Sequence, residues 1–167
     1  FFGEAIPAAV AALAEHHRAR LRLTLQAREE QLEQAKAALQ ATGIEAEVAP
    51  FFDRMGERLA KAHLMISRAG ASTVSEVAAM GLPSILVPYP HALVHDQAAN
   101  AAELMEQGGG IIAHQHTLDQ PTLTAHIAAA MDEPDRLHAH AKAAAAAGKP
   151  RATLDLADLV EKVAKGG

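Results

Sequence analysis

The sequence predicts an α/β fold, a Rossmann-like parallel sheet with helices on both faces. Helical and strand-like segments alternate throughout the chain, and repeated βα alternation is typical of a parallel sheet covered on both sides. Apolar residues make up 50% of the chain but aromatic residues only 3%, so the core must be built from Ala, Leu, Val and Ile. A length of 167 residues suits one domain with a substantial core.

The first elements follow from hydrophobic periodicity. Pro7–Arg18 is an Ala-rich amphipathic segment, predicted as a helix with Pro7 in its first turn, where proline is tolerated. Leu21–Leu25 alternates with a period of two and predicts a strand. Glu29–Thr42 has apolar residues at helical spacing and ends at Gly43, a residue suited to the position after a helix.

The middle of the chain continues the alternation. Ile44–Ala49 predicts a strand, and Asp53–Ala62 predicts a short helix with Asp53 as a possible N-cap. Leu64–Ile66 predicts a buried strand, and Val74–Met80 predicts a helix that ends at a glycine.

The remaining predicted elements are two strands and several helices. Pro83–Val87 predicts a buried strand, Gln97–Gln107 a helix, and Ile111–Ala113 a short last strand. From Gln120 onward the sequence predicts only helices, including one over residues 150–167. The expected breaks between these helices fall at Pro121, Pro134 and Lys149-Pro150.

Composition excludes several classes of function. The net charge is −5, without a long basic cluster, so nucleic acid is not an expected partner. Cysteine is absent, which excludes disulfides and thiolate chemistry. No apolar run reaches the roughly 18 residues that span a bilayer, and no signal peptide is expected. The chain begins at Phe1 without Met, as expected for a piece of a longer protein.

The segment Ser67–Glu76 carries the clearest functional signal. A turn of small residues follows a predicted strand and leads into a helix, so a ligand could approach the backbone closely. The N–H groups of a helix N-terminus attract phosphate, and Glu76 could accept hydrogen bonds from vicinal sugar hydroxyls. These features predict a nucleotide-diphosphate site. The alternative is a capping box, in which Thr73 caps the helix and Glu76 bonds back to it.

Three segments rich in small or polar residues follow predicted strands. They are Pro50–Met55, Arg68–Glu76 and Pro88–Asn100. Ligands of parallel α/β sheets bind beyond the carboxyl ends of the strands. The sequence therefore predicts that the three segments converge on one binding edge.

The order and spacing of several motifs are familiar. Phe51-Phe52-Asp53-Arg54-Met55, the segment Ser67–Glu76, Gly81-Leu82-Pro83 with Val87-Pro88-Tyr89-Pro90, and Asp96-Gln97-Ala98-Ala99-Asn100-Ala101 occur in this sequence. Together they resemble the C-terminal domain of the MurG family, over nearly the whole chain. The resemblance implies the C-terminal half of a GT-B glycosyltransferase, with residues 1–167 as the UDP-sugar-binding domain. The N-terminal acceptor domain and the first Gly-rich loop would lie outside this chain.

The resemblance also implies roles for individual residues. Phe52 and Met55 would hold the uracil, and Glu76 would bind the ribose hydroxyls. The remaining expected substrate contacts, to the diphosphate and then to the sugar, are Ala71, Ser72 and Thr73, followed by Asp96, Gln97 and Asn100. Arg68 and His91 are nearby polar groups without an implied role.

The function implied by the resemblance is that of an inverting N-acetylglucosaminyltransferase that converts lipid I to lipid II in peptidoglycan synthesis. The donor would be UDP-N-acetylglucosamine, and no cofactor is required. The lipid I acceptor, the catalytic base and the membrane contact would belong to the missing N-terminal domain, so this chain alone would be inactive. The expected location is the cytoplasmic face of the bacterial inner membrane, as a peripheral protein. Two alternatives stay open, a UDP-N-acetylglucosamine 2-epimerase domain and a stand-alone donor-binding subunit of a split transferase.

The ten histidines raise the question of a metal site. His114 and His116 could point the same way from a strand, whereas His138 and His140 do not face each other on a helix. No metal site is predicted. His95 beside Asp96 could serve acid–base chemistry, although a solvated loop histidine is the simpler interpretation.

The same resemblance predicts an interrupted sheet. A strand and loop upstream of Phe1 would lie in the middle of the family's sheet. Without that strand, backbone donors and acceptors of its two neighbours lose their partners. We therefore expect a gap, unless strand exchange between copies closes it.

Overall fold

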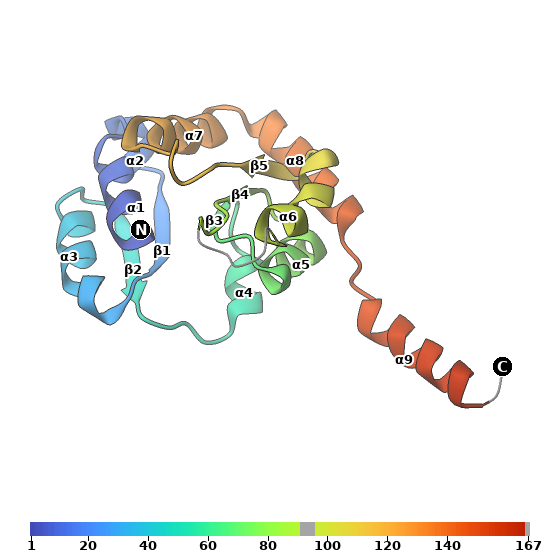
Figure 1. Ribbon diagram of the computed structural model, residues 1–167. Helices are drawn as coiled ribbons and strands as arrows, with labels where there is room; N and C mark the ends of the chain where they lie inside the picture. The colour runs from blue at the N-terminus through green and yellow to red at the C-terminus, as the bar shows by residue number, and fades with distance from the viewer. Residues whose placement is uncertain (91–95, 166–167) are drawn as a thin grey trace. The chain divides into compact units, whose positions relative to one another are not determined.

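The computed structural model describes residues 1–90 and 96–165. The chain forms two compact units (Figure 1). The first unit consists of Phe1–Lys61 and Ala113–Leu137. The second unit consists of Ala62–Ile112 and His138–Gly167.

The first unit is a two-stranded parallel sheet with its helices. The strands β1 (Arg22–Gln26) and β2 (Glu45–Ala49) pair in parallel, with Leu25 opposite Val48. The helices of this unit are α1 (Phe2–Ala11), α2 (Glu15–Arg18), α3 (Glu29–Gln40), α4 (Met55–Leu59) and α7 (Gln120–Asp132). The predicted strands Leu21–Leu25 and Ile44–Ala49 are thus confirmed, each displaced by one residue at the start.

Helix α1 is packed between α3 and α7 (Figure 1). Its buried Ala9 and Val10 and the fully buried Leu39 of α3 and Leu123 of α7 form the core of the first unit. The Thr124 hydroxyl of α7 donates a hydrogen bond to the Ala9 carbonyl at 3.1 Å. The first unit is therefore completed by a helix from a distant part of the sequence.

The predicted single helix Pro7–Arg18 is wrong. The chain instead forms α1 and α2, and Pro7 is an interior residue of α1. The Arg18 guanidinium donates hydrogen bonds to the carbonyls of Ala11, at 3.3 Å, and of Leu13. These carbonyls lie at and beyond the end of α1, where backbone acceptors need partners from outside the helix. The Arg18 side chain therefore favours the break.

The second unit contains a three-stranded parallel sheet in the order β3-β4-β5. Its strands are β3 (Met65–Ser67), β4 (Ser84–Leu86) and β5 (Gly110–Ile112). The central strand β4 is buried along its whole length. The helices of this unit are α5 (Ala71–Met80), α6 (Asp96–Glu106), the larger part of α8 (Pro134–Ala147), and α9 (Ala152–Ala164). All three predicted strands of this region are confirmed, as are the predicted helix breaks at Pro134 and at Lys149-Pro150. The predicted break at Pro121 is wrong, because α7 begins at Gln120 and Pro121 lies in its first turn, where proline is tolerated.

Backbone geometry requires glycine at two positions of the second unit. A Cβ on Gly110 would lie 2.1 Å from the carbonyl oxygen of Ser84, so only glycine lets β5 pair with β4 at this point. Gly81 follows α5 with a φ of 61°, a left-handed conformation that ends the helix. The chain therefore turns directly from α5 into β4.

The expected interruption of the sheet is confirmed. Among the described strands, β1 and β2 form one sheet and β3, β4 and β5 another, so no ladder joins all five. The cause that the resemblance suggests, a strand upstream of Phe1, stays a prediction.

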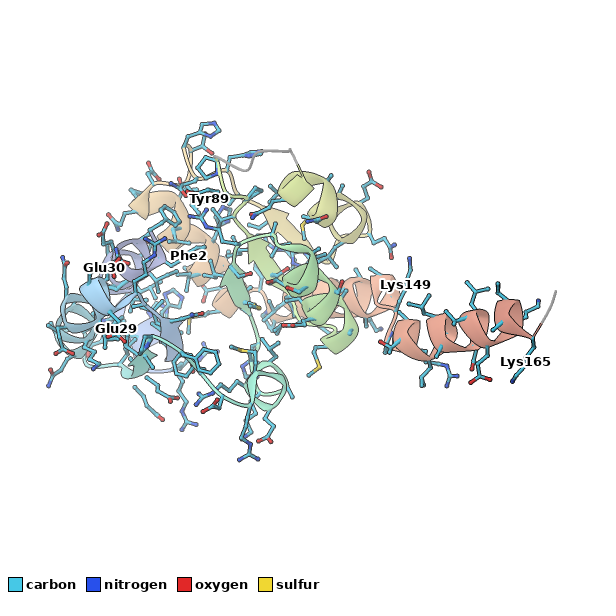
Figure 2. The ribbon with its side chains drawn as sticks, turned by 60° about the horizontal axis from the view of Figure 1, so that its bottom comes forward. Phe2, Glu29, Glu30, Tyr89, Lys149 and Lys165 are labelled. Atoms are coloured by element: carbon cyan, nitrogen blue, oxygen red, sulfur yellow. The ribbon has the colours of Figure 1, made fainter. Side chains whose placement is uncertain are left out.

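Helix α9 has no buried residue. Figure 2 marks Lys149 before this helix and Lys165 after it. Its exposed apolar side chains are Leu154, Leu156, Leu159, Val160 and Val163. Within residues 1–90 and 96–165, no helix is long and apolar enough to span a membrane.

Candidate functional site

The first predicted site segment, Pro50–Met55, directly follows β2. The Gln26 side chain, at the end of β1, donates a hydrogen bond to the Pro50 carbonyl at 3.0 Å. The two aromatic residues that follow point to different environments, since Phe52 is 7% exposed and Phe51 is 71% exposed. Phe52 thus anchors the segment, and Phe51 offers an open ring face. The sequence interpretation missed Phe51, although adjacent residues of an extended segment generally face opposite ways.

Helix α4 begins after an unusual backbone conformation. Its N-cap is Arg54, with φ and ψ of 56° and 44°, in the left-handed region. The prediction of Asp53 as N-cap is therefore wrong, because the helix starts one residue later, at Met55, and has no side-chain cap. Met55 is 39% exposed, so its side chain is accessible at the start of the helix. Left-handed conformations of non-glycine residues are strained and often occur at functional sites.

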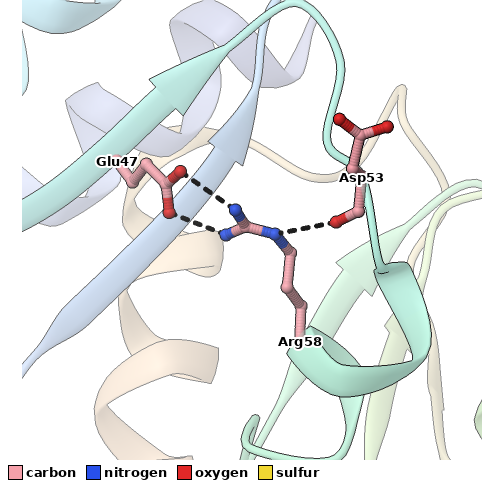
Figure 3. Close-up of polar contacts among 3 residues, drawn as sticks. All are labelled: Glu47, Asp53 and Arg58. Atoms are coloured by element: carbon pink, nitrogen blue, oxygen red, sulfur yellow. Dashed lines mark hydrogen bonds and ion pairs between the residues drawn. The ribbon is translucent and has the colours of Figure 1, made fainter.

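Arg58 of α4 connects this segment to β2 (Figure 3). Its Nη1 and Nη2 donate to the two carboxylate oxygens of Glu47, at 2.7 and 3.1 Å, and its Nε donates to the Asp53 carbonyl at 3.3 Å. The guanidinium carbon lies 4.5 Å from the centre of the Phe52 ring. The hydrogen bonds from Arg58 lower the pKa of the Glu47 carboxyl, which keeps this pair ionised.

The second predicted site segment lies in the second unit, between β3 and α5. Gly70 is the N-cap of α5 in an extended conformation and provides no side-chain cap. Val74 is the first residue of α5 whose N–H bonds back, to the Gly70 carbonyl at 2.9 Å. The N–H groups of Ala71, Ser72 and Thr73 have no acceptor among the described residues. They form the exposed, partly positive end of a helix, which suits a phosphate group.

The capping-box interpretation of Thr73 and Glu76 is wrong. Helix α5 starts at Ala71, three residues earlier than predicted, so Thr73 lies inside the first turn instead of before it. Ala71 and Ser72 are the first two residues of α5, and Gly70 is the N-cap before them. Glu76 is exposed and makes no hydrogen bond to a described residue. Its carboxylate is therefore available to a ligand.

Arg68 joins the second segment to the third. Its guanidinium donates to the carbonyls of Val87 and Pro88, both at 3.3 Å, at the end of β4. Its guanidinium carbon also lies 5.3 Å from the ring centre of Tyr89, which is labelled in Figure 2. The sequence left Arg68 without a role, and the structure gives it one in positioning the loop after β4.

Helix α6 contacts both of these loops. The Gln97 oxygen Oε1 accepts a hydrogen bond from the Tyr89 backbone N–H at 2.8 Å. The Asn100 amide Nδ2 donates to the carbonyl of the buried Ala69, at 3.4 Å. Asn100 thus has a structural partner, in the turn before α5 and not in the loop that precedes α6. Asp96 begins α6, but its side chain, like His91 and His95, lies outside the described residues.

The structure therefore brings together two of the three predicted segments. Arg68–Glu76 and Pro88–Asn100 meet in the second unit, where Arg68 donates to the Pro88 carbonyl and Asn100 donates to the Ala69 carbonyl. Phe52 and Met55 belong to the first unit. Their convergence with the other segments stays a prediction.

One cluster of possible metal ligands occurs among the described residues. Ligand atoms of His16, His17 and Asp132 lie within 4.8 Å of one another. His17 is buried, its Nε2 lies 2.9 Å from Asp132 Oδ1, and its Nδ1 has no described partner. A cation on Nε2 would leave a proton on this buried Nδ1, whereas metal-bound histidines normally donate that proton to an acceptor. The geometry thus favours a hydrogen bond between His17 and Asp132. The rings of His114 and His116 lie 5.7 Å apart, without a third ligand among the described residues.

The fold and the two meeting loops suit a glycosyltransferase domain, and sequence comparison identifies its family. The family model described as "Glycosyltransferase family 28 C-terminal domain" matches residues 1–156. The chain belongs to this family.

Individual relatives agree with this assignment. The chain is 53% identical to a Brucella canis protein named UDP-N-acetylglucosamine--N-acetylmuramyl-(pentapeptide) pyrophosphoryl-undecaprenol N-acetylglucosamine transferase, over 99% of this chain and 44% of that protein. A Brucella suis biovar 1 protein of the same name is 52% identical over the same shares. The crystal structure of Acinetobacter baumannii MurG superposes with a TM-score of 0.81 at 30% identity, covering 96% of this chain and 48% of that one. The chain thus spans less than half the length of these relatives. The similarity to the MurG structure confirms the GT-B assignment of the fold.

Proposed function

We propose that this chain is the donor-binding domain of an inverting N-acetylglucosaminyltransferase that converts lipid I to lipid II. The observation that carries the proposal is the 53% identity to the Brucella transferase over 99% of the chain. The available N–H groups of Ala71, Ser72 and Thr73 and the unengaged carboxylate of Glu76 support it. The name of the Brucella protein also favours a transferase over the epimerase alternative.

In this proposal each part of the site has one task. The uracil lies on the Phe51–Met55 segment, and the diphosphate lies at the N-terminus of α5. Glu76 accepts hydrogen bonds from the ribose hydroxyls. Asp96, Gln97 and Asn100 lie toward the sugar, where Gln97 retains the donors of its Nε2 and Asn100 retains its acceptor Oδ1.

The proposed chemistry is a displacement at the anomeric carbon. The acceptor hydroxyl attacks this carbon, the bond to the diphosphate oxygen breaks, and UDP leaves with the bonding electrons. The helix N-terminus stabilises the negative charge that develops on the leaving group. The base that removes the hydroxyl proton, the lipid acceptor site and the contact with the cytoplasmic membrane face are proposed to lie in a second domain.

Nucleotide titration tests the proposal. Isothermal calorimetry on the complete protein that carries residues 1–167 should show UDP and UDP-N-acetylglucosamine binding at least about tenfold more tightly than ADP. Equal binding of UDP and ADP would exclude the proposed uracil contact. Binding of UDP without turnover of lipid I would exclude the proposed acceptor while retaining the donor site.

A further inference from the structure

We infer that Arg58 is a positioning residue for the nucleobase subsite, where it holds the Phe51–Met55 segment in the conformation that receives the base. This inference rests on the proposed function, because the proposed base is the uracil of the donor. It assigns Arg58 and its partner Glu47 a part in donor specificity.

The guanidinium of Arg58 contacts its surroundings on three sides, and Figure 3 draws two of them, the contacts with Glu47 and Asp53. The edge formed by Nη1 and Nη2 donates to both oxygens of Glu47, at 2.7 and 3.1 Å. The Nε edge donates to the Asp53 carbonyl at 3.3 Å. The face of the group lies over the Phe52 ring, with 4.5 Å from the guanidinium carbon to the ring centre. One planar group therefore connects β2, the site segment and α4.

Two side-chain hydrogen bonds hold the two ends of a short stretch of backbone. Gln26 holds the Pro50 carbonyl, and Arg58 holds the Asp53 carbonyl. Between these two points, the backbone N–H and carbonyl groups of Phe51 and Phe52 have no hydrogen-bond partner among the described residues. The stretch thus presents unpaired donors and acceptors from a fixed frame.

Such a frame suits the edge of a uracil ring. The N3–H of uracil is a donor beside two carbonyl acceptors, so backbone carbonyl and N–H groups can pair with it, whereas adenine has the reverse pattern at the equivalent positions. Discrimination then depends on where the backbone groups lie, to within a fraction of an ångström. Arg58 controls that position through Asp53 and Phe52.

A lysine cannot reproduce this arrangement. Its ammonium is a point charge, and it lacks the planar fork that binds a carboxylate at two oxygens and the flat face that covers an aromatic ring. R58K therefore retains the charge near Glu47 and loses the geometry. R58M retains most of the side-chain length and loses both.

The test compares UDP with ADP in the complete protein that carries residues 1–167. The variants are R58K, R58M and E47Q, with R22M as matched control. Arg22 of β1 also pairs with a glutamate of β2, Glu45, at 3.0 Å, but this pair lies away from the site segment. Calorimetry gives the affinities, and thermal unfolding gives the stability. R58M should weaken UDP binding about tenfold and change ADP binding less than about twofold. R58K and E47Q should change the preference in the same direction by less, and R22M should leave it unchanged.

Two outcomes would overturn the inference. The first is an unchanged preference for UDP in R58M and E47Q, and the second is an equal loss of UDP and ADP affinity. If R58M does not fold, the comparison of E47Q with R22M decides in the same way. A wild-type protein without any preference for UDP would overturn the proposed function and this inference together. If only this inference fails, the wild-type protein still prefers UDP, so the two failures are distinguishable.

Discussion

The Gln97 side-chain oxygen Oε1 accepts a hydrogen bond from the backbone N–H of Tyr89 at 2.8 Å. This bond connects the first turn of α6 to the loop that follows β4. It uses only the acceptor of the amide, so the Nε2 donors are free of any described partner. One side chain can therefore position the loop and still donate to a ligand.

Gln97→Glu should separate these two functions. A carboxylate still accepts from the Tyr89 N–H, but it cannot donate to a sugar hydroxyl. We expect UDP-N-acetylglucosamine to bind about three- to tenfold more weakly, as for one lost hydrogen bond, with UDP binding and the melting temperature changed much less. Calorimetry with both nucleotides measures this. Equal weakening for UDP and UDP-N-acetylglucosamine would show that Gln97 does not contact the sugar.

Glu76→Gln tests the proposed ribose contact. Since Glu76 does not cap α5, the substitution should leave the melting temperature unchanged. Loss of a charge-assisted hydrogen bond should weaken UDP binding about ten- to a hundredfold. The ratio of the affinities for UDP and 2′-deoxy-UDP should also decrease, because the variant loses the charge-assisted hydrogen bond to the 2′-hydroxyl of the ribose. Glu106→Gln, at an exposed position near the end of α6, is the matched control.

Phe51 and Phe52 should respond differently to truncation. Phe52→Ala removes a buried ring and should destabilise the protein by about 3 kcal/mol. Phe51→Ala removes an exposed ring and should leave the stability unchanged while it weakens UDP binding by about 1–3 kcal/mol, the range for aromatic stacking on a base. Thermal unfolding and UDP titration of both variants test this contrast. A Phe51→Ala protein with wild-type UDP affinity would contradict the stacking role.

Asp119 should contribute a pH-dependent part of the stability. Its Oδ1 accepts from the Thr122 N–H at 2.9 Å and caps α7. Hydrogen bonding with Thr122, through its side chain first and its backbone N–H second, holds the pKa of the Asp119 carboxyl below its ordinary value. Asp119→Ala should lower the melting temperature by about 2–4 °C at pH 7, and Asp119→Asn by less. Because the folded-state pKa is the lower one, the contribution is complete above the unfolded-state pKa and disappears as the pH falls through the folded-state value. A difference between wild type and Asp119→Ala that persists at pH 2 would contradict this assignment.

The sequence predicted which helices and strands occur more reliably than it predicted their first and last residues. The apolar runs before Ser67 and Pro88 correctly predicted strands, because burial on both faces of a parallel sheet requires such runs. The start of α5 was misplaced because Thr73 and Glu76 fit the spacing of a capping box, while Ala71 and Ser72 are also able to extend the helix. Local patterns of this kind have more than one solution, and the tertiary structure selects between them.

The candidate site was predictable in its segments and not in its internal contacts. The turn before Glu76 was evident from its small residues. The contacts of Arg68 with Pro88 and of Arg58 with Glu47 join residues whose approach depends on how strands and helices pack. No periodicity or spacing in the sequence records those pairs.

The partition of the chain has a consequence for the order in which it folds. The first unit draws on Phe1–Lys61 and on Ala113–Leu137, and the bond between His17 and Asp132 joins residues 115 positions apart. Closing so long a loop must precede the contacts that compensate for its entropy, which slows folding. On a ribosome, α1 emerges before α7, so its packing stays incomplete until α7 has been synthesised. Within residues 1–167, the segment made first is therefore among the last to complete its contacts.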